Sequence, residues 1–92
     1  MRIRWTVGAV ADLQEIYAYL VEHQMPLAKS TIKELYEGIL SLERFPRRGR
    51  EGREAGTREL VFAPVPYIAA YRLKEQTIEI LYVHHTSRQR RQ

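Results

Sequence analysis

The stretch TRELVFAPVPYIAAYRLKEQTIEILYV (residues 57–83) decides the fold, because it holds three runs of strand-forming residues divided by short breaks. The runs are residues 57–63, 67–73 and 77–83, and each is rich in β-branched, aromatic or other apolar side chains. Connections of only three residues force neighbouring strands to run antiparallel. The middle run is nearly all apolar, which is typical of the central strand of a sheet that helices cover on one face.

The residues before this stretch predict one further strand and two helices. Residues 2–5 alternate charged and apolar side chains, as a short strand does. Thr6 is placed to cap a helix, Pro26 to begin a second helix, and Phe45-Pro46 to end it. Apolar residues recur at helical spacing in both segments: Ala9, Leu13, Ile16, Tyr17 and Leu20 in the first, and Ala28, Ile32, Leu35, Ile39 and Leu42 in the second.

The predicted order is therefore β-α-α-β-β-β, an α+β fold in which an antiparallel helical hairpin packs on a small antiparallel sheet. Residues 46–56 contain three glycines and a proline, so we expect them to form a loop. A chain of 92 residues suffices for one core, and we expect a single domain over residues 1–92.

Composition excludes several classes of function. The chain has no cysteine, which rules out disulfides, zinc–thiolate sites and a thiol nucleophile and fits a cytoplasmic location. No run approaches the roughly 18 apolar residues of a membrane span, and the start of the chain does not resemble a signal peptide. No phosphate-cradling glycine motif is present. We expect no cofactor and no membrane partner.

Charge is unevenly distributed along the chain. Residues 6–43 hold six acidic residues against two lysines, a net charge of −4, whereas residues 44–58 hold six arginines against two glutamates, a net charge of +4. A polarised surface of this kind suits an anionic partner. Arginine binds phosphate in a bidentate manner, so the arginines of the glycine-rich loop can contact a nucleic-acid backbone. Solvated loops that are merely basic remain an equal alternative.

Two adjacent histidines, His84 and His85, follow the last strand. Neighbouring residues of a strand point to opposite faces, so the pair is a poor metal site. One histidine is enough for acid–base chemistry, although a histidine that is simply hydrogen-bonded at a strand end is the more common situation. Tyr67, Tyr71 and Tyr82 are expected to be core or half-core residues. Asp12 and Glu15 are expected on the solvated side of the first helix.

Four segments, in this order, resemble toxins of the RelE/ParE superfamily from bacterial type II toxin–antitoxin systems. The first is a W…A..DL..I..Y pattern, formed here by Trp5, Ala9, Asp12, Leu13, Ile16 and Tyr19. The others are FPRRGREGREAGTRELV (45–61), PYIAAYRL (66–73) and IEILYVHHTSRQ (78–89). The resemblance covers essentially the whole chain. It implies a cognate antitoxin protein as partner, held on the helical hairpin and the arginine-rich edge.

The superfamily has two branches that act on different targets. RelE-like members cut mRNA on the ribosome, and in that case His85 would be the base, with Arg58, Arg72 and Arg88 on the phosphate. Ile68 and Leu60 replace two basic residues of that branch, and Thr86 replaces a tyrosine. A ribonuclease needs such cations because its transition state carries extra negative charge.

ParE-like members inhibit DNA gyrase and have no catalytic site of their own. The segments PYI..YR and V.H..RQ are similar to this branch, which the sequence therefore favours. The expected contact residues are then Arg47, Arg48, Arg50, Arg53, His85, Arg88, Arg90 and Arg91. A third alternative is a non-toxic remnant that still binds its antitoxin.

Overall fold

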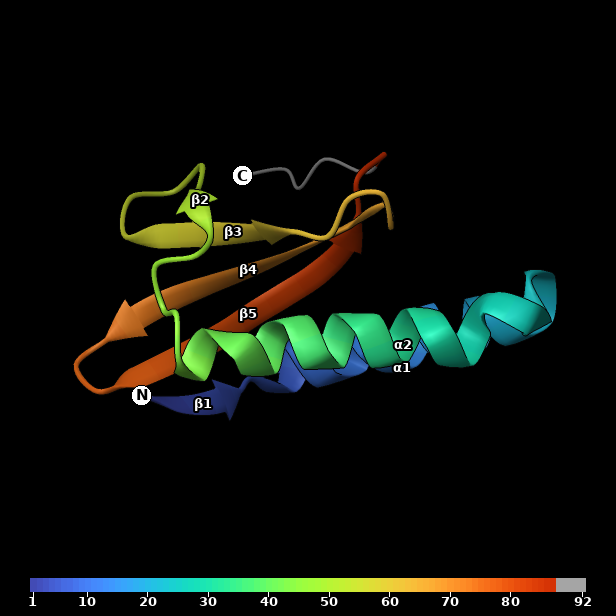
Figure 1. The fold of residues 1–92 in the computed structure, drawn as a ribbon, viewed down its shortest axis with the longest axis horizontal. Helices are drawn as coiled ribbons and strands as arrows, with labels where there is room; N and C mark the ends of the chain where they lie inside the picture. The colour runs from blue at the N-terminus through green and yellow to red at the C-terminus, as the bar shows by residue number, and fades with distance from the viewer. Residues whose placement is uncertain (88–92) are drawn as a thin grey trace.

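The computed structural model describes residues 1–87, which form two helices packed on one face of a five-stranded sheet (Figure 1). The strands occur in the spatial order β1-β5-β4-β3-β2. Their bounds are β1 (Arg2–Trp5), β2 (Arg50–Glu51), β3 (Thr57–Val61), β4 (Tyr67–Lys74) and β5 (Thr77–His85). The nearly apolar run predicted to be central is β4, the middle strand.

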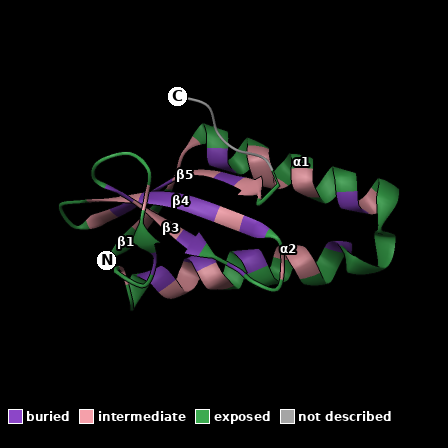
Figure 2. Cartoon of the chain, turned by 90° about the horizontal axis from the view of Figure 1, so that it is seen from above, coloured by how far each residue is buried: buried purple, intermediate pink, exposed green. Residues whose placement is uncertain are grey.

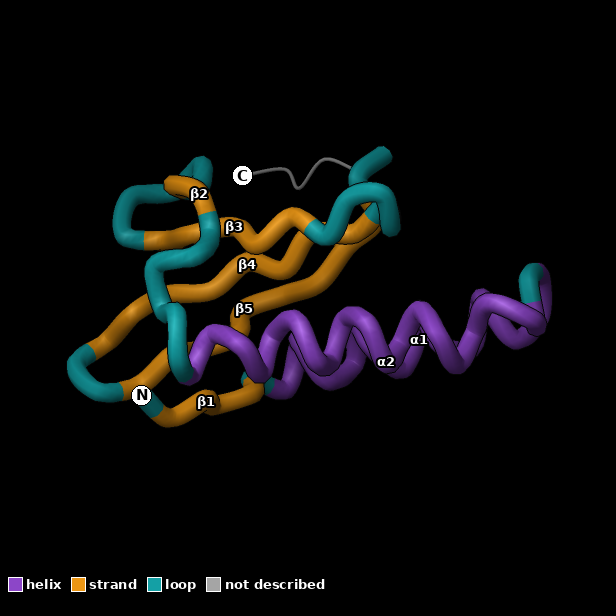
Figure 3. Tube along the Cα trace, in the orientation of Figure 1, coloured by secondary structure: helices purple, strands orange, loops and turns teal. Residues whose placement is uncertain are grey.

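The helical hairpin consists of α1 (Val7–His23) and α2 (Met25–Leu40) (Figure 3). The short helix η1 (Ser41–Glu43) follows it. Thr6 caps α1 as predicted: its hydroxyl accepts a hydrogen bond from Ala9 N at 3.2 Å and donates one to Ile80 O at 2.6 Å. The second bond joins the helix start to the sheet. Gln24 alone separates the helices, and Pro26 lies in the first turn of α2.

The predicted α+β class and the order β-α-α-β-β-β are confirmed, with two differences in the sheet. First, β1 pairs with β5 in parallel, so the sheet is mixed rather than antiparallel. The hairpin returns the chain to its starting end before β3, so β3 and β5 run in the same direction as β1. Second, the predicted loop 46–56 contains β2, where Arg50 pairs with Glu59 and Glu51 with Arg58.

The core lies between the hairpin and the sheet, as the buried residues in Figure 2 show. Leu35 and Ile39 of α2 lie in one core cluster with apolar residues on the helix side of the sheet, including Ile78 and Ile80. Gly38 lets α2 approach the ring of Phe62 closely, because a Cβ at this position would lie 2.3 Å from that ring. Within residues 1–87 no helix packs on the opposite face of the sheet, and we call it the open face.

A β-bulge in β5 decides which face its last residues occupy. Tyr71 pairs with Ile80 and Ala70 with Tyr82, so Leu81 is the extra residue. Paired residues of neighbouring strands point to the same face. Val83 and His85 therefore face the helices, and His84 lies on the open face with Ile68.

Within residues 1–87, neither helix has the length and apolar character needed to cross a membrane.

Candidate functional site

A groove of about 660 Å³ runs between the helical hairpin and the ends of β4 and β5. The hairpin extends past the sheet here, so its inner side is not fully covered (Figure 1). We call it the hairpin groove. The lining residues are Asp12, Glu15, Ile16, Tyr19, Leu20, Gln24, Leu27, Thr31, Pro66, Tyr67, Val83, His84, His85 and Ser87. The groove is lined by apolar side chains and by the carboxylates of Asp12 and Glu15. Such a lining suits an amphipathic protein segment that carries basic residues.

Asp12 is not simply solvated, contrary to the expectation from the sequence. Its Oδ2 accepts a hydrogen bond from Val83 N at 2.9 Å. β1 pairs with β5 only as far as Ile80, so the N–H of Val83 lies at an open edge of the sheet. Asp12 satisfies this group, and the Thr6 hydroxyl, which donates to Ile80 O, also lies 3.3 Å from the carbonyl oxygen of Leu81. α1 thus closes the edge that β1 leaves open.

The two histidines are on opposite faces, as the alternation of a strand predicts. The ring of His85 meets that of Tyr67 edge to face, with 5.3 Å between centroids. Its Nδ1 accepts a hydrogen bond from Ser87 N at 3.0 Å. The ring of His84 lies 5.2 Å from that of Tyr82 on the open face. Among residues 1–87, no group of three or more His, Cys, Asp or Glu side chains is arranged to hold a metal ion.

Glutamates partly neutralise the arginines on the open face. Glu79 lies 2.7 Å from Arg4 and 4.0 Å from Arg72. At the other edge of the sheet, Arg50 donates two hydrogen bonds to Glu59, at 3.0 and 3.2 Å. Both glutamate side chains are only 12% exposed. This face therefore offers less net positive charge than its arginines alone suggest.

Arg58 is used by the fold itself. It pairs with Tyr71 and so points to the helix side of the sheet. Its guanidinium donates hydrogen bonds to the carbonyl oxygens of Gly49 and Arg47, the second at 3.3 Å. Arg58 consequently holds the loop before β2 in place.

The residues of the possible ribonuclease site do not come together. His85 pairs with Tyr67 at one end of β4, whereas Arg72 lies five positions further along that strand. At about 3.4 Å per residue, the two positions are roughly 17 Å apart. They also point to opposite faces. Arg88 lies outside the described residues, as do Arg90 and Arg91.

From inside the core, Tyr71 fixes the arginine-rich segment of residues 47–53, which we call the basic loop. Its side chain is fully buried, and its hydroxyl donates to Pro46 O and accepts from Gly49 N, both at 2.8 Å. Gly49 is required here, because a Cβ would lie 2.8 Å from the Tyr71 hydroxyl. Arg47, Arg48 and Arg53 are exposed on the segment that this contact orders.

Sequence reasoning missed the roles of Asp12, Tyr71 and Glu79. A signal for Asp12 was present, because it follows Ala9 by three positions and precedes Ile16 by four, which places it beside the apolar stripe. A core tyrosine needs a partner for its hydroxyl, but nothing in the sequence indicates that the partner is a loop 22 residues away. The partners of Glu79 depend on strand register.

A solved structure supports the class of the fold. The chain is similar to a chain in the structure of the chromosomal ParDE toxin–antitoxin system from P. aeruginosa, with a TM-score of 0.85 and 30% sequence identity. The match covers 92% of this chain and 95% of that one. Two helices on a five-stranded mixed sheet are thus the architecture of a RelE/ParE superfamily toxin.

Sequence comparisons define the family. The model for the ParE toxin of the type II toxin–antitoxin system parDE matches residues 3–90. The putative toxin Y4kP of Sinorhizobium fredii is 40% identical, over 96% of this chain and 91% of that protein. The toxin RelE2 of Caulobacter vibrioides is 32% identical, over 95% of this chain and 97% of that protein. The chain belongs to the ParE toxin family of type II toxin–antitoxin systems.

Proposed function

We propose that this toxin inhibits DNA gyrase by binding to it and stabilises the cleaved state of the gyrase–DNA complex. The observation that carries the proposal is the pairing of Glu79 with Arg4 and Arg72 on the open face. A ribonuclease must hold extra negative charge in its transition state, and each lost cation typically costs a few kcal/mol. The carboxylate of Glu79 beside Arg72, a residue of the possible ribonuclease site, opposes such chemistry. Membership of the ParE toxin family supports the same target.

The toxin would act as a binding protein without a reaction of its own. The basic loop and the end of the chain are the proposed contact surfaces for gyrase. The contact residues are Arg47, Arg48, Arg50, Arg53, His85, Arg88, Arg90 and Arg91. Tyr71 and Arg58 order the loop before the target arrives, which lowers the conformational entropy lost on binding.

A cognate antitoxin is the second proposed partner, and the hairpin groove is its proposed docking surface. Antitoxins of this kind supply an extended or helical segment, and the groove offers an apolar floor with Ile16, Leu20 and Val83. Asp12 and Glu15 add negative charge at one side, which favours basic residues on the incoming segment. An antitoxin seated here would cover His85 as well.

Ribosome-dependent mRNA cleavage is the alternative function. One observation favours it: the relative named toxin RelE2. The Nδ1 of His85 accepts a hydrogen bond from Ser87 N, so the neutral ring carries its proton on Nε2 and must release Nδ1 before it can act as a base. His85 would then be the base, and Arg58, Arg72 and Arg88 would contact the phosphate. This requires Arg58 to leave its carbonyl partners and Arg72 to approach from the other face.

The deciding experiment combines two assays on one protein preparation. The purified toxin at micromolar concentration is added to gyrase with supercoiled plasmid, and to a ribosomal translation reaction whose mRNA is read by primer extension. We expect linear plasmid after denaturation and intact mRNA. Cleaved mRNA with unaffected gyrase would overturn the proposal, and its loss in His85→Ala would identify the ribonuclease. No effect in either assay, with unimpaired growth on expression, would indicate a non-toxic remnant.

A further inference from the structure

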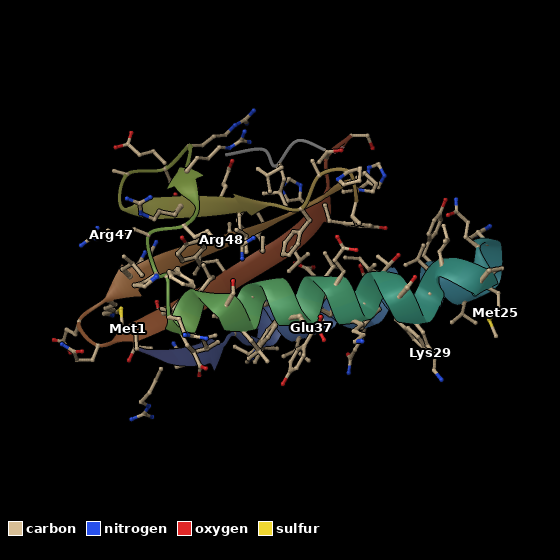
Figure 4. All side chains as sticks on the ribbon, in the orientation of Figure 1. Met1, Met25, Lys29, Glu37, Arg47 and Arg48 are labelled. Carbon is tan, nitrogen blue, oxygen red and sulfur yellow. The ribbon has the colours of Figure 1, made fainter. Side chains whose placement is uncertain are left out.

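The end of α2 and the start of the basic loop form a cationic surface around an exposed aromatic ring. Phe45 is 58% exposed and, with Ser41, Pro46, Arg47 and Arg48, lines a shallow hollow of about 690 Å³. The guanidinium of Arg44 lies 5.9 Å from the centroid of the Phe45 ring. We call residues 44–48 the basic corner. It lies at the opposite end of the molecule from Met25 and Lys29 (Figure 4).

Several hydrogen bonds order the basic corner. Tyr71 donates to Pro46 O at 2.8 Å, and Arg58 donates to Arg47 O at 3.3 Å. Arg48 donates to the Ser41 hydroxyl at 2.5 Å, which in turn donates to Gly38 O at 2.5 Å. The corner is therefore held by the sheet and by α2 together, unlike a loop that solvent alone surrounds.

The arginines of the basic corner also differ from those of the open face in their charge partners. Within residues 1–87, Arg44, Arg47 and Arg48 have no carboxylate within 4.0 Å, whereas Arg4, Arg50 and Arg72 do. Three cations without counter-ions around one surface attract an anionic partner. Because the fold holds the backbone of these three arginines in place, they suit a partner whose negative charges are regularly spaced.

We propose that the basic corner binds single-stranded nucleic acid, with a base stacked on Phe45 and the neighbouring phosphates on Arg47 and Arg48. A flat, exposed ring bordered by cations is the arrangement that proteins use for unpaired bases. A duplex keeps its bases stacked inside and can use only the arginines. This inference goes beyond the proposed function, because gyrase inhibition through protein contacts does not require it. The site is also separate from the open face and from His85.

The test uses the full-length toxin without gyrase or ribosomes, so its failure is distinguishable from failure of the proposed function. Fluorescence anisotropy measures binding of labelled dT12, of rU12, and of the dT12·dA12 duplex. We expect Phe45→Leu to weaken binding of both single strands roughly tenfold, since base–aromatic stacking contributes about 1–3 kcal/mol per base. Duplex binding should be unchanged by this variant. A preference between dT12 and rU12 identifies which nucleic acid the corner favours.

A double variant tests the arginines, and a lysine variant far from the corner is its control. Changing both Arg47→Gln and Arg48→Gln should lower the salt dependence of single-strand affinity by about 1.4 in the log–log slope, at roughly 0.7 per phosphate contact. Lys29→Gln removes one exposed charge at the far end of the molecule and should change affinity less than about twofold. Equal thermal midpoints would show that all variants fold.

Three results would overturn the inference: an affinity unchanged by Phe45→Leu, a loss in Lys29→Gln as large as in the arginine variants, or a duplex bound as tightly as dT12. If single-strand binding is absent and the arginine variants lose gyrase inhibition instead, the corner contacts protein, and the inference is wrong.

Discussion

The carboxylate of Glu79 lies 2.7 Å from the guanidinium of Arg4, on the open face of the sheet. Arg72 approaches the same carboxylate group to 4.0 Å, and the whole Glu79 residue is only 9% exposed. A nearly buried carboxylate between two arginines gives this face a structural ion network. The same arginines would otherwise be available to a phosphate, which is why this relationship bears directly on the choice of target.

Removing the charge of Glu79 should weaken the fold modestly. Glu79→Gln keeps the shape of the side chain but loses the attraction to Arg4 and Arg72, so we expect the free energy of unfolding to fall by about 1 kcal/mol. Urea denaturation at low salt measures it, and the difference should shrink at 1 M salt. Glu37→Gln is the control, because its pair with Lys33 is exposed and 3.9 Å long. Equal losses in both variants would contradict the role given to Glu79.

Tyr71→Phe should destabilise the protein and loosen the basic loop. The ring still fills the core, but Pro46 O and Gly49 N lose their buried partner, which costs about 1–3 kcal/mol. Urea denaturation gives the stability, and hydrogen exchange of the Gly49 amide should become faster. Tyr36→Phe removes a hydroxyl from a half-exposed ring stacked on Trp5 and should change stability by less than about 0.5 kcal/mol. A Gly49 amide that exchanges equally slowly in Tyr71→Phe would refute the contact.

Asp12→Ala should cost more stability than its position on α1 suggests. It leaves the N–H of Val83 without a partner, for an expected loss of about 1–2 kcal/mol. Asp12→Asn retains an acceptor oxygen and should recover most of this loss. Glu15→Ala, one turn further along the same helix, should be nearly neutral because Glu15 is exposed. Thermal denaturation of the three variants compares them, and an Asp12→Ala variant as stable as Glu15→Ala would be inconsistent with the edge contact.

Antitoxin binding should depend on the residues that line the hairpin groove and not on exposed apolar residues outside it. Leu27 lines the groove and is 50% exposed, so Leu27→Glu should fold while placing a charge on an apolar docking surface. We expect isothermal titration with the cognate antitoxin to show at least about tenfold weaker binding. Met25→Glu is the matched control, because Met25 is 65% exposed and outside the groove lining. Similar affinities for both variants would place the antitoxin elsewhere.

Local signals in the sequence predicted the elements of the fold well. The cap at Thr6, the break before Pro26 and the three strand runs all depend on neighbouring residues, and each is present in the structure. The parallel pairing of β1 with β5 joins residues 75 positions apart, and no local pattern specifies it. The bulge at Leu81 also depends on pairing between strands, so the sequence did not predict it. Its one local sign is that two adjacent apolar residues, Ile80 and Leu81, interrupt the alternation there.

The candidate sites were harder to predict, because their properties come from pairs formed by the fold. The sequence shows how many arginines the chain has but not which of them meet a glutamate. Arg50 and Arg47 are three residues apart, yet Arg50 is paired with Glu59 and Arg47 has no ion pair within residues 1–87. Strand register decides this difference. Conversely, the separation of His84 from His85 onto opposite faces was predictable, since it follows from strand geometry alone.

Inhibition of gyrase by the toxin is tested most directly by the trapping of cleaved DNA by purified gyrase in the presence of the toxin. Supercoiled plasmid, gyrase and increasing toxin are incubated and then denatured, and linear plasmid is quantified. We expect linear DNA that rises with toxin and falls when the cognate antitoxin is added. Supercoiling that proceeds unchanged at micromolar toxin, with no linear product, would contradict it.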